Sequence, residues 1–261
     1  MKERIDILLV ERRLVESRVK AQWLIKNGLV LVNGIEIIKP GKKIDNSLEI
    51  QLKSEFPYVG KGGLKLEAAL KEFNISVKGK VCIDIGSSIG GFTDCLIKQD
   101  ALRVYAVDTA TDLLHPSLRC EKMKNRVIPL LGVDARKLTE MQEMVDLCTI
   151  DITFASIKEI LPIIKQFLKK EGEIISLIKP IFETEYYNTE KFKVVKEKSK
   201  LKSILLDSIR WSLKNDIYPY GIMKSPILGK GGSIEFLIYY KVDRENIDLN
   251  YESRINELIY D

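Results

Sequence analysis

Over the first part of the chain, the spacing of apolar residues changes within short segments from that of helices to that of strands. The pattern predicts a short amphipathic helix near the N-terminus and a second helix over residues 18–26, with Ser17 as its N-cap. Asn33-Gly34 is the strongest hairpin signal in the chain, and a later alternating run predicts another strand. We therefore predict a compact α+β domain over residues 1–57.

From residue 81 onward, apolar runs of strand length alternate with segments of helix length. The five runs are VCIDI, VYAV, VIPLL, VDLCTI and EIISLI. Such alternation predicts a parallel sheet with helices on both faces. A lysine-rich stretch over residues 191–202 then leads into a helix and two further strands, at 218–223 and 234–240. The expected α/β sheet therefore has seven strands, most of them parallel.

Glycines separate these two regions, and charged residues dominate the end of the chain. We assign residues 58–63, which contain three glycines, to a linker and residues 64–243 to the α/β domain. Residues 244–261 are charged and poorly patterned, so we expect a loosely held tail there.

Composition narrows the chemistry that the chain can perform. Its 45% hydrophobic and 30% charged residues are typical of a soluble globular protein. No apolar run has the roughly 18 residues of a membrane helix, so we expect a cytoplasmic protein without a membrane partner. Four isolated cysteines and one histidine disfavour a metal site, a disulfide scaffold and a Ser-His-Asp triad. The net charge of +5 permits a polyanionic partner without requiring one.

The first parallel strand runs into the glycine-rich loop DIGSSIGGF. Glycines let the backbone turn tightly and approach a ligand at the carboxyl edge of a sheet. The spacing D-x-G-x-x-x-G-G disfavours a dinucleotide and suits S-adenosylmethionine, with a nicotinamide enzyme as the alternative. Asp108 after the second strand is placed to accept ribose hydroxyls, and Asp134 after the third to meet the adenine amine. The predicted cofactor-binding residues are Asp84, Gly86, Ser87, Ser88, Gly90, Gly91, Phe92, Asp108 and Asp134.

Two charged residues follow the fourth and fifth strands, Asp151 and Lys179. Both are expected to project from the same edge of the sheet, beside the cofactor. A desolvated ammonium has a lowered pKa and a neighbouring carboxylate acts the other way, so the pair can take the proton of a sugar hydroxyl. A structural salt bridge is the alternative. The chain lacks an Asn/Asp-Pro-Pro-Tyr motif and a cysteine after either strand, which favours oxygen over a base nitrogen or carbon as methyl acceptor.

The motifs follow the order of a known family over nearly the whole chain. RIDILLVERRLVESRVKAQWLIKNGLVLVNG, YVGKGGLKLEAAL, DIGSSIGGFTD, VYAVD, DITF, LIKPIFE and GGSIEFLIY resemble the TlyA-like (haemolysin-A-type) rRNA 2'-O-methyltransferases. The resemblance implies a Rossmann-like class I methyltransferase domain of the FtsJ-like group behind an S-four type RNA-binding domain. It also implies a catalytic tetrad at Lys65, Asp151, Lys179 and Glu235, in which Lys179 activates the 2'-hydroxyl.

The same resemblance implies methylation of cytidine ribose in ribosomal RNA, free or within ribosomal subunits. Three stretches depart from the family pattern, namely TATDLL after Asp108, LLGV before Asp134 and TEYYNTEKFK after residue 183. The tetrad positions are retained, so these departures bear on the target nucleotide rather than on the chemistry.

Basic and polar residues of the N-terminal domain are predicted to contact RNA. Ser17 and Arg18 lie at a helix N-terminus, where backbone N–H groups favour a phosphate. Solvated charges are the alternative, and the shape of folded RNA is the expected readout. The predicted RNA-binding residues are Arg4, Ser17, Arg18, Lys20 and Asn33.

Other classes of function stay open at the level of sequence. A non-catalytic ribosome-binding or assembly protein would bind the cofactor without transferring a methyl group. A membrane-active haemolysin would release dye from liposomes, and a nicotinamide oxidoreductase would be stabilised by a different cofactor. The oligomeric state and the exact nucleotide are not encoded in any motif.

Overall fold

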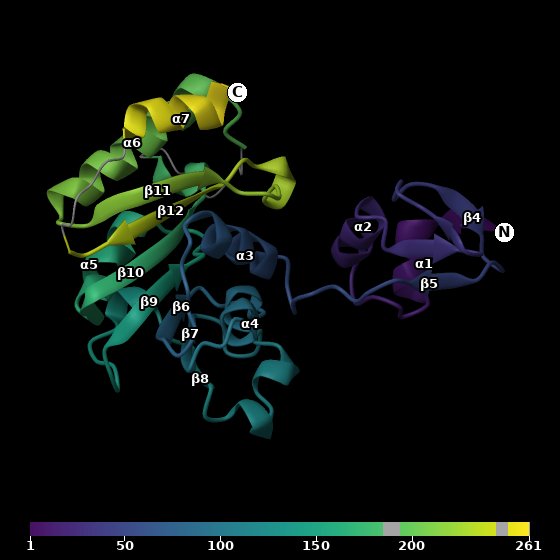
Figure 1. The fold of residues 1–261 in the computed structure, drawn as a ribbon, viewed down its shortest axis with the longest axis horizontal. Coiled ribbons are helices and arrows are strands. Elements are labelled where there is room, and N and C mark those ends of the chain that lie inside the picture. Colours follow the sequence, from purple (N-terminus) through teal and green to yellow (C-terminus); the bar gives the residue numbers. More distant parts are fainter. Residues whose placement is uncertain (185–193, 244–249, 261) are drawn as a thin grey trace. The chain divides into compact units, whose positions relative to one another are not determined.

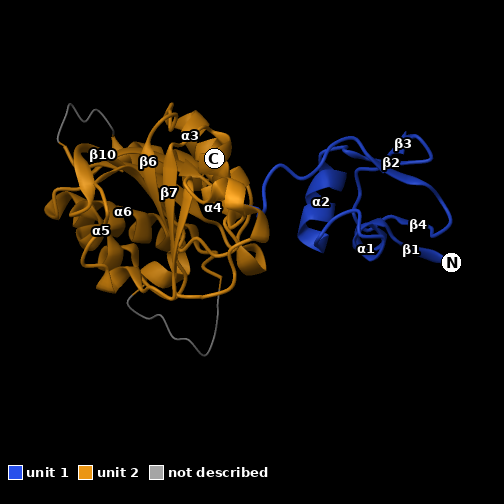
Figure 2. Cartoon of the chain, turned by 90° about the horizontal axis from the view of Figure 1, so that it is seen from below, with its two compact units in different colours: residues 1–61 blue, residues 62–261 orange. Residues whose placement is uncertain are grey.

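The computed structural model describes residues 1–184, 194–243 and 250–260. The chain divides into two compact units, Met1–Lys61 and Gly62–Asp261, which Figure 2 colours separately. Each unit has its own hydrophobic core, so each is described by itself.

The N-terminal unit combines two helices with two small antiparallel sheets. Its elements are β1 (Lys2–Arg4), α1 (Ile5–Glu11), α2 (Arg18–Lys26), β2 (Val30–Val32), β3 (Ile35–Glu36), β4 (Lys43–Asp45) and β5 (Ile50–Leu52). Strand β1 pairs with β4, and β2 lies between β3 and β5. The Ser17 side chain accepts from the Lys20 amide, so the predicted N-cap is confirmed. Asn33 and Gly34 have left-handed φ values of 48° and 78°, as the predicted hairpin turn requires.

The second unit contains a seven-stranded, mostly parallel sheet, as predicted (Figure 1). Its elements are α3 (Gly62–Glu72), β6 (Val81–Ile85), α4 (Gly91–Lys98), β7 (Arg103–Asp108), β8 (Val127–Leu131), β9 (Val145–Ile150), α5 (Ile157–Lys165), β10 (Leu168–Ile178), α6 (Lys198–Lys214), β11 (Tyr218–Lys224), β12 (Phe236–Lys241) and α7 (Tyr251–Tyr260). The strand order is β11-β12-β10-β9-β6-β7-β8, and β12 runs antiparallel to both of its neighbours. The carboxyl ends of β6, β7, β9 and β10 therefore share one edge.

Helices cover both faces of this sheet. Helices α5, α6 and α7 share a core cluster with one face, to which Tyr240 belongs. The preceding residue, Tyr239, points to the other face, because side chains alternate along a strand. There it stacks on Phe73, which directly follows α3, with ring centroids 5.6 Å apart. Helix α3 in turn packs against α4.

Two sequence predictions about this unit are wrong. The connections from β7 to β8 and from β8 to β9 hold only short 3-10 turns in place of helices. The expected loose tail instead contains α7, because Ile255 and Ile259, four residues apart, are buried against the core. Residues 191–193 of the lysine-rich stretch and 185–193 of TEYYNTEKFK lie outside the described residues.

Candidate active site at the carboxyl edge of the sheet

The glycine-rich loop between β6 and α4 lies directly against the end of β9. Gly86 has a φ of 80°, and a side-chain carbon placed on it would lie 2.5 Å from the Asp151 carbonyl oxygen. The Asp151 amide donates to the Ile85 carbonyl at 2.9 Å. Gly90 has a φ of 96° and forms the N-cap of α4. Only glycine satisfies both the backbone conformation and the close approach at Gly86.

Asp108 closes this loop from β7. One carboxylate oxygen accepts from the Ser88 amide at 2.7 Å, and the other accepts from the Ala110 amide at 2.8 Å. Ser87, between Gly86 and Ser88, is buried, and its Oγ has no hydrogen-bond partner among the described residues. A buried hydroxyl without a partner beside a glycine cradle fits a polar group of a bound cofactor. The loop and Asp108 thus come together as predicted, whereas their contact with a cofactor stays a prediction.

Asp84 lies beneath the loop and is completely buried. Its carboxylate accepts from Thr93 Oγ1 at 2.6 Å and from Thr149 Oγ1 at 3.0 Å. Burial raises the pKa of Asp84 to about 7, although both hydroxyls favour the charged form. Asp84 therefore supports the loop from below.

We expect Asp84→Asn to reveal this titration through stability. An acid whose pKa is raised by folding stabilises the fold fully below its unfolded pKa near 4, and this contribution is lost as pH rises through about 7. The unfolding free energy of the wild type should fall relative to that of the variant by up to about 4 kcal/mol between pH 4 and pH 8. Urea unfolding at several pH values measures the difference. A difference that is constant across this range would show that Asp84 does not titrate there.

The Asp134 side chain bonds to the turn that directly follows it. It caps the 3-10 turn Ala135–Lys137, and its carboxylate binds the Arg136 guanidinium, with an Oδ2–Nη2 distance of 2.8 Å. Hydrogen bonds from Arg136 lower the pKa of Asp134. Arg136 also pairs with Glu159 of α5 at 3.0 Å. The predicted contact between Asp134 and an adenine amine therefore stays a prediction.

Lys179 and Asp151 form an ion pair at the ends of β10 and β9. The Lys179 Nζ lies 2.5 Å from Asp151 Oδ1, and it also donates to Thr153 Oγ1 at 3.0 Å. The two side chains are 16% and 23% exposed, so they are partly desolvated yet reachable by a ligand. The predicted juxtaposition of this amine and this carboxylate is confirmed.

A second ion pair, between Lys65 of α3 and Glu235, lies next to the first. The Lys65 Nζ is 2.5 Å from Glu235 Oε2, and both side chains are at most 5% exposed. Ile178 of β10 pairs with Phe236 of the antiparallel β12. The residue after Ile178 and the residue before Phe236 are therefore cross-strand neighbours, and these are Lys179 and Glu235. The structure thus brings all four tetrad positions to one edge of the sheet.

Sequence reasoning missed two residues near this edge. Phe154 is 66% exposed and has a φ of 69°, which is rare for a bulky side chain. Its ring lies 5.6 Å from that of Phe182. Glu183 is partly buried and accepts from Ser156 Oγ at 2.5 Å and from the Ile157 amide at 2.9 Å. These contacts join the segment after Asp151 to the segment after Lys179; the motifs DITF and KPIFE were their only sequence signal.

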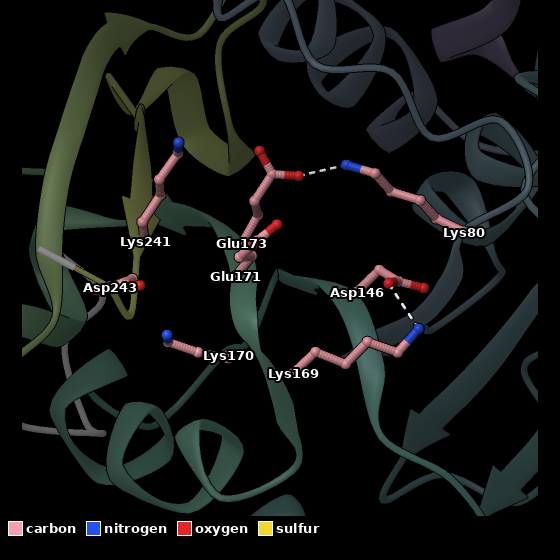
Figure 3. Close-up of a pocket in the computed structure, with 8 residues that line it drawn as sticks. All are labelled: Lys80, Asp146, Lys169, Lys170, Glu171, Glu173, Lys241 and Asp243. Carbon is pink, nitrogen blue, oxygen red and sulfur yellow. Dashed lines mark hydrogen bonds and ion pairs between the residues drawn. The ribbon is translucent and has the colours of Figure 1, made fainter. Parts of the chain in front are cut away.

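A charged pocket lies at the opposite, amino edge of the sheet (Figure 3). Four lysines and four carboxylates line it, and two ion pairs form among them. Lys80 pairs with Glu173, and Lys169 pairs with Asp146 at 2.7 Å. These pairs lie at the beginnings of the strands, away from the glycine loop.

The N-terminal unit positions the predicted RNA-binding residues in different ways. Arg4 and Arg18 both bind the buried carboxylate of Asp6. Lys20 pairs with Glu16, and its Nζ lies 5.5 Å from the centre of the Phe56 ring. The Ser17 side chain caps α2, and Asn33 Oδ1 accepts from the Glu49 amide at 3.1 Å. Arg4 and Arg18 are thus the pair that the structure holds together most directly, and contact of any of the five with RNA stays a prediction.

Two family models match the chain. The FtsJ-like methyltransferase model matches residues 58–242, and the S4 domain model matches residues 3–50. The first covers the seven-stranded sheet with both ion pairs, and the second covers most of the N-terminal unit.

Similar proteins match over most of their length. The chain is 40% identical to "Putative rRNA methyltransferase YqxC" of Bacillus subtilis (strain 168), over 91% of this chain and 85% of that protein. It is 31% identical to "16S/23S rRNA (cytidine-2'-O)-methyltransferase TlyA" of Mycobacterium tuberculosis (strain ATCC 25618 / H37Rv), over 93% and 91%. A solved structure, "Putative hemolysin from Streptococcus thermophilus", aligns with a TM-score of 0.72 at 34% identity, covering 99% of this chain and 94% of that one.

Two features are absent from the part of the chain that the structure describes. Across residues 1–184, 194–243 and 250–260, no helix combines the length and hydropathy needed to cross a bilayer. Within the same ranges, His, Cys, Asp and Glu side chains form no group of three or more that could hold a metal ion.

Proposed function

Because the chain belongs to the TlyA-type branch of the FtsJ-like methyltransferases, we propose that it transfers a methyl group from S-adenosylmethionine to a ribose 2'-oxygen of ribosomal RNA. The observation that carries this proposal is the Lys179–Asp151 pair, partly exposed beside the glycine loop. A general base next to a methyl donor is what alkylation of a hydroxyl needs.

In the proposed reaction, S-adenosylmethionine supplies an electrophilic methyl group, and the loop from Gly86 to Phe92 together with Asp108 would hold it. Lys179 Nζ accepts the 2'-hydroxyl proton as the oxygen forms its bond to the methyl carbon. The carbon–sulfur bond breaks and S-adenosylhomocysteine leaves. Asp151 orients the Lys179 amine through their 2.5 Å contact.

The buried Lys65–Glu235 pair has a supporting role in this proposal. Glu235 is the cross-strand neighbour of Lys179, so its negative charge borders the site. Lys65 neutralises that charge at 2.5 Å and ties α3 to the sheet. A buried charge that lost its partner would be costly, so the pair fixes the local geometry around Lys179.

We further propose that the N-terminal unit binds the RNA and that the nucleotide is a cytidine. The S4 domain match supports the first point, and the name of the Mycobacterium relative supports the second. A ribosomal RNA substrate implies a cytoplasmic reaction.

Transfer of tritiated methyl groups to 16S and 23S rRNA and to ribosomal subunits lacking the modification tests the proposal. Mapping 2'-O-methyl groups by mass spectrometry then gives the nucleotide. Incorporation into a base would contradict 2'-oxygen as the acceptor. S-adenosylmethionine binding without transfer to any form of rRNA would favour a non-catalytic ribosome-binding protein.

Phe154 offers an exposed ring three residues after Asp151, which suits stacking on a base of the bound RNA. Stacking is worth about 1–3 kcal/mol per base, so Phe154→Ala should raise the KM for RNA roughly 5- to 150-fold. Phe154→Tyr should behave like the wild type, because its ring can still stack. Steady-state kinetics with rRNA measure the KM of both variants, and calorimetry with S-adenosylmethionine measures their binding of the methyl donor. An unchanged KM for RNA would argue against the stacking role.

A further inference from the structure

Asp6 is the only charged residue of α1 that is buried, and its side chain is completely buried. Its carboxylate collects hydrogen bonds from three side chains. Arg4 donates through Nε at 2.9 Å and Nη2 at 3.0 Å, Arg18 through Nη2 at 3.0 Å, and Gln22 through Nε2 at 2.8 Å. These hydrogen bonds hold the pKa of Asp6 well below its usual range, and the one from Arg4 has the largest effect.

The two arginines on Asp6 come from different elements and remain accessible. Arg4 ends β1 and is 40% exposed, whereas Arg18 begins α2 and is 55% exposed. Each guanidinium carries five N–H donors, and Asp6 takes two from Arg4 and one from Arg18. One carboxylate thus bridges two cations that would otherwise repel each other, and the cluster keeps a net charge of +1.

We propose that Asp6 is a positioning residue for RNA, which holds Arg4 and Arg18 in a fixed pair so that both guanidinium groups engage phosphates of one RNA backbone. The inference rests on the proposed function in that RNA is the ligand. Arginine binds phosphate through a planar fork, and a fork that is already oriented loses less conformational entropy on binding.

Asp6→Asn separates this role from simple electrostatics, because the two predict opposite signs. Removal of a negative charge next to two arginines should tighten RNA binding if only net charge matters. If Asp6 positions the arginines, the variant should bind more weakly, by about tenfold or more, despite its extra positive charge. Binding of the full chain to 16S and 23S rRNA at 50 and 150 mM salt, without S-adenosylmethionine, measures this directly.

Glu11→Gln is the matched control. Glu11 is exposed at the end of α1, so its replacement changes the net charge equally and should slightly tighten binding. Equal or tighter binding by Asp6→Asn than by Glu11→Gln would overturn the inference. Circular dichroism and thermal melting report whether Asp6→Asn keeps the fold of the N-terminal unit.

Arg18→Lys tests the same inference without removing the buried carboxylate. The charge stays, so the salt dependence should be unchanged, but the planar fork is lost and affinity should fall about fivefold. Wild-type affinity in this variant would overturn the inference even if Asp6→Asn failed to fold. Since binding is measured without the methyl donor, a chain that bound rRNA through the Asp6 cluster but transferred no methyl would contradict only the proposed reaction.

Discussion

Lys179→Ala is expected to lower kcat for methyl transfer to rRNA by about 10²- to 10⁴-fold, the usual contribution of a positioned general base. The substitution removes the amine that lies 2.5 Å from Asp151 and leaves the glycine loop unchanged. The Kd for S-adenosylmethionine should therefore stay close to that of the wild type. Single-turnover transfer of tritiated methyl groups gives the rate, and calorimetry gives the Kd.

Lys169→Ala is the control for this experiment. Lys169 is also paired with an aspartate, Asp146, but at the amino edge of the sheet. Its loss removes one lysine and one ion pair without touching the proposed site, so the rate should change less than twofold. If Lys179→Ala incorporated methyl groups as fast as Lys169→Ala, Lys179 would have no part in the chemistry.

Gly86→Ala is expected to destabilise the second unit by roughly 2–5 kcal/mol and to abolish measurable S-adenosylmethionine binding. A left-handed backbone costs an alanine about 1–2 kcal/mol, and overpacking adds about 1–3 kcal/mol. The overpacking arises because the new carbon would lie 2.5 Å from the Asp151 carbonyl oxygen, so the loop must leave the end of β9. Urea unfolding and calorimetry measure the two effects.

Gly79→Ala separates backbone strain from the close approach. Gly79 has a φ of 72°, similar to that of Gly86, but a side-chain carbon there meets nothing within 4 Å. Gly79→Ala should lower the unfolding free energy by only about 1–2 kcal/mol and leave cofactor binding intact. Equal losses of stability in the two variants would mean that the packing of Gly86 on β9 contributes little.

The sequence predicted those parts of the fold whose signals are local. The Ser17 cap and the Asn33-Gly34 turn are set by neighbouring residues, and both were confirmed. The strands of the large sheet were found because their apolar runs are nearly continuous. Strands β1 (Lys2–Arg4) and β4 (Lys43–Asp45) were missed, because five of their six residues are charged and they show no apolar alternation. Helix α7 was missed, because its core-facing residues, Tyr251, Ile255, Leu258 and Ile259, are interspersed with charged and polar neighbours.

The candidate site was predicted only in part, namely where strand order brings its residues together. Asp151 and Lys179 follow neighbouring parallel strands, so their juxtaposition could be expected from topology. Lys65 and Glu235 are 170 residues apart, and only tertiary packing brings them together, so spacing could not identify them. Asp6 looks like an ordinary solvated acid in the sequence, because nothing local reveals that it is buried under two arginines.

The position of β12 between β10 and β11 has a consequence for biosynthesis. Glu235 precedes this strand and is the last tetrad residue to leave the ribosome, whereas Lys65 is the first. Until β12 inserts, the Lys65 ammonium lacks its carboxylate, and a nascent chain can fold β6 to β9 without a finished site. A chain that terminated before β12 would therefore lack Glu235 and leave Lys65 without its buried carboxylate partner.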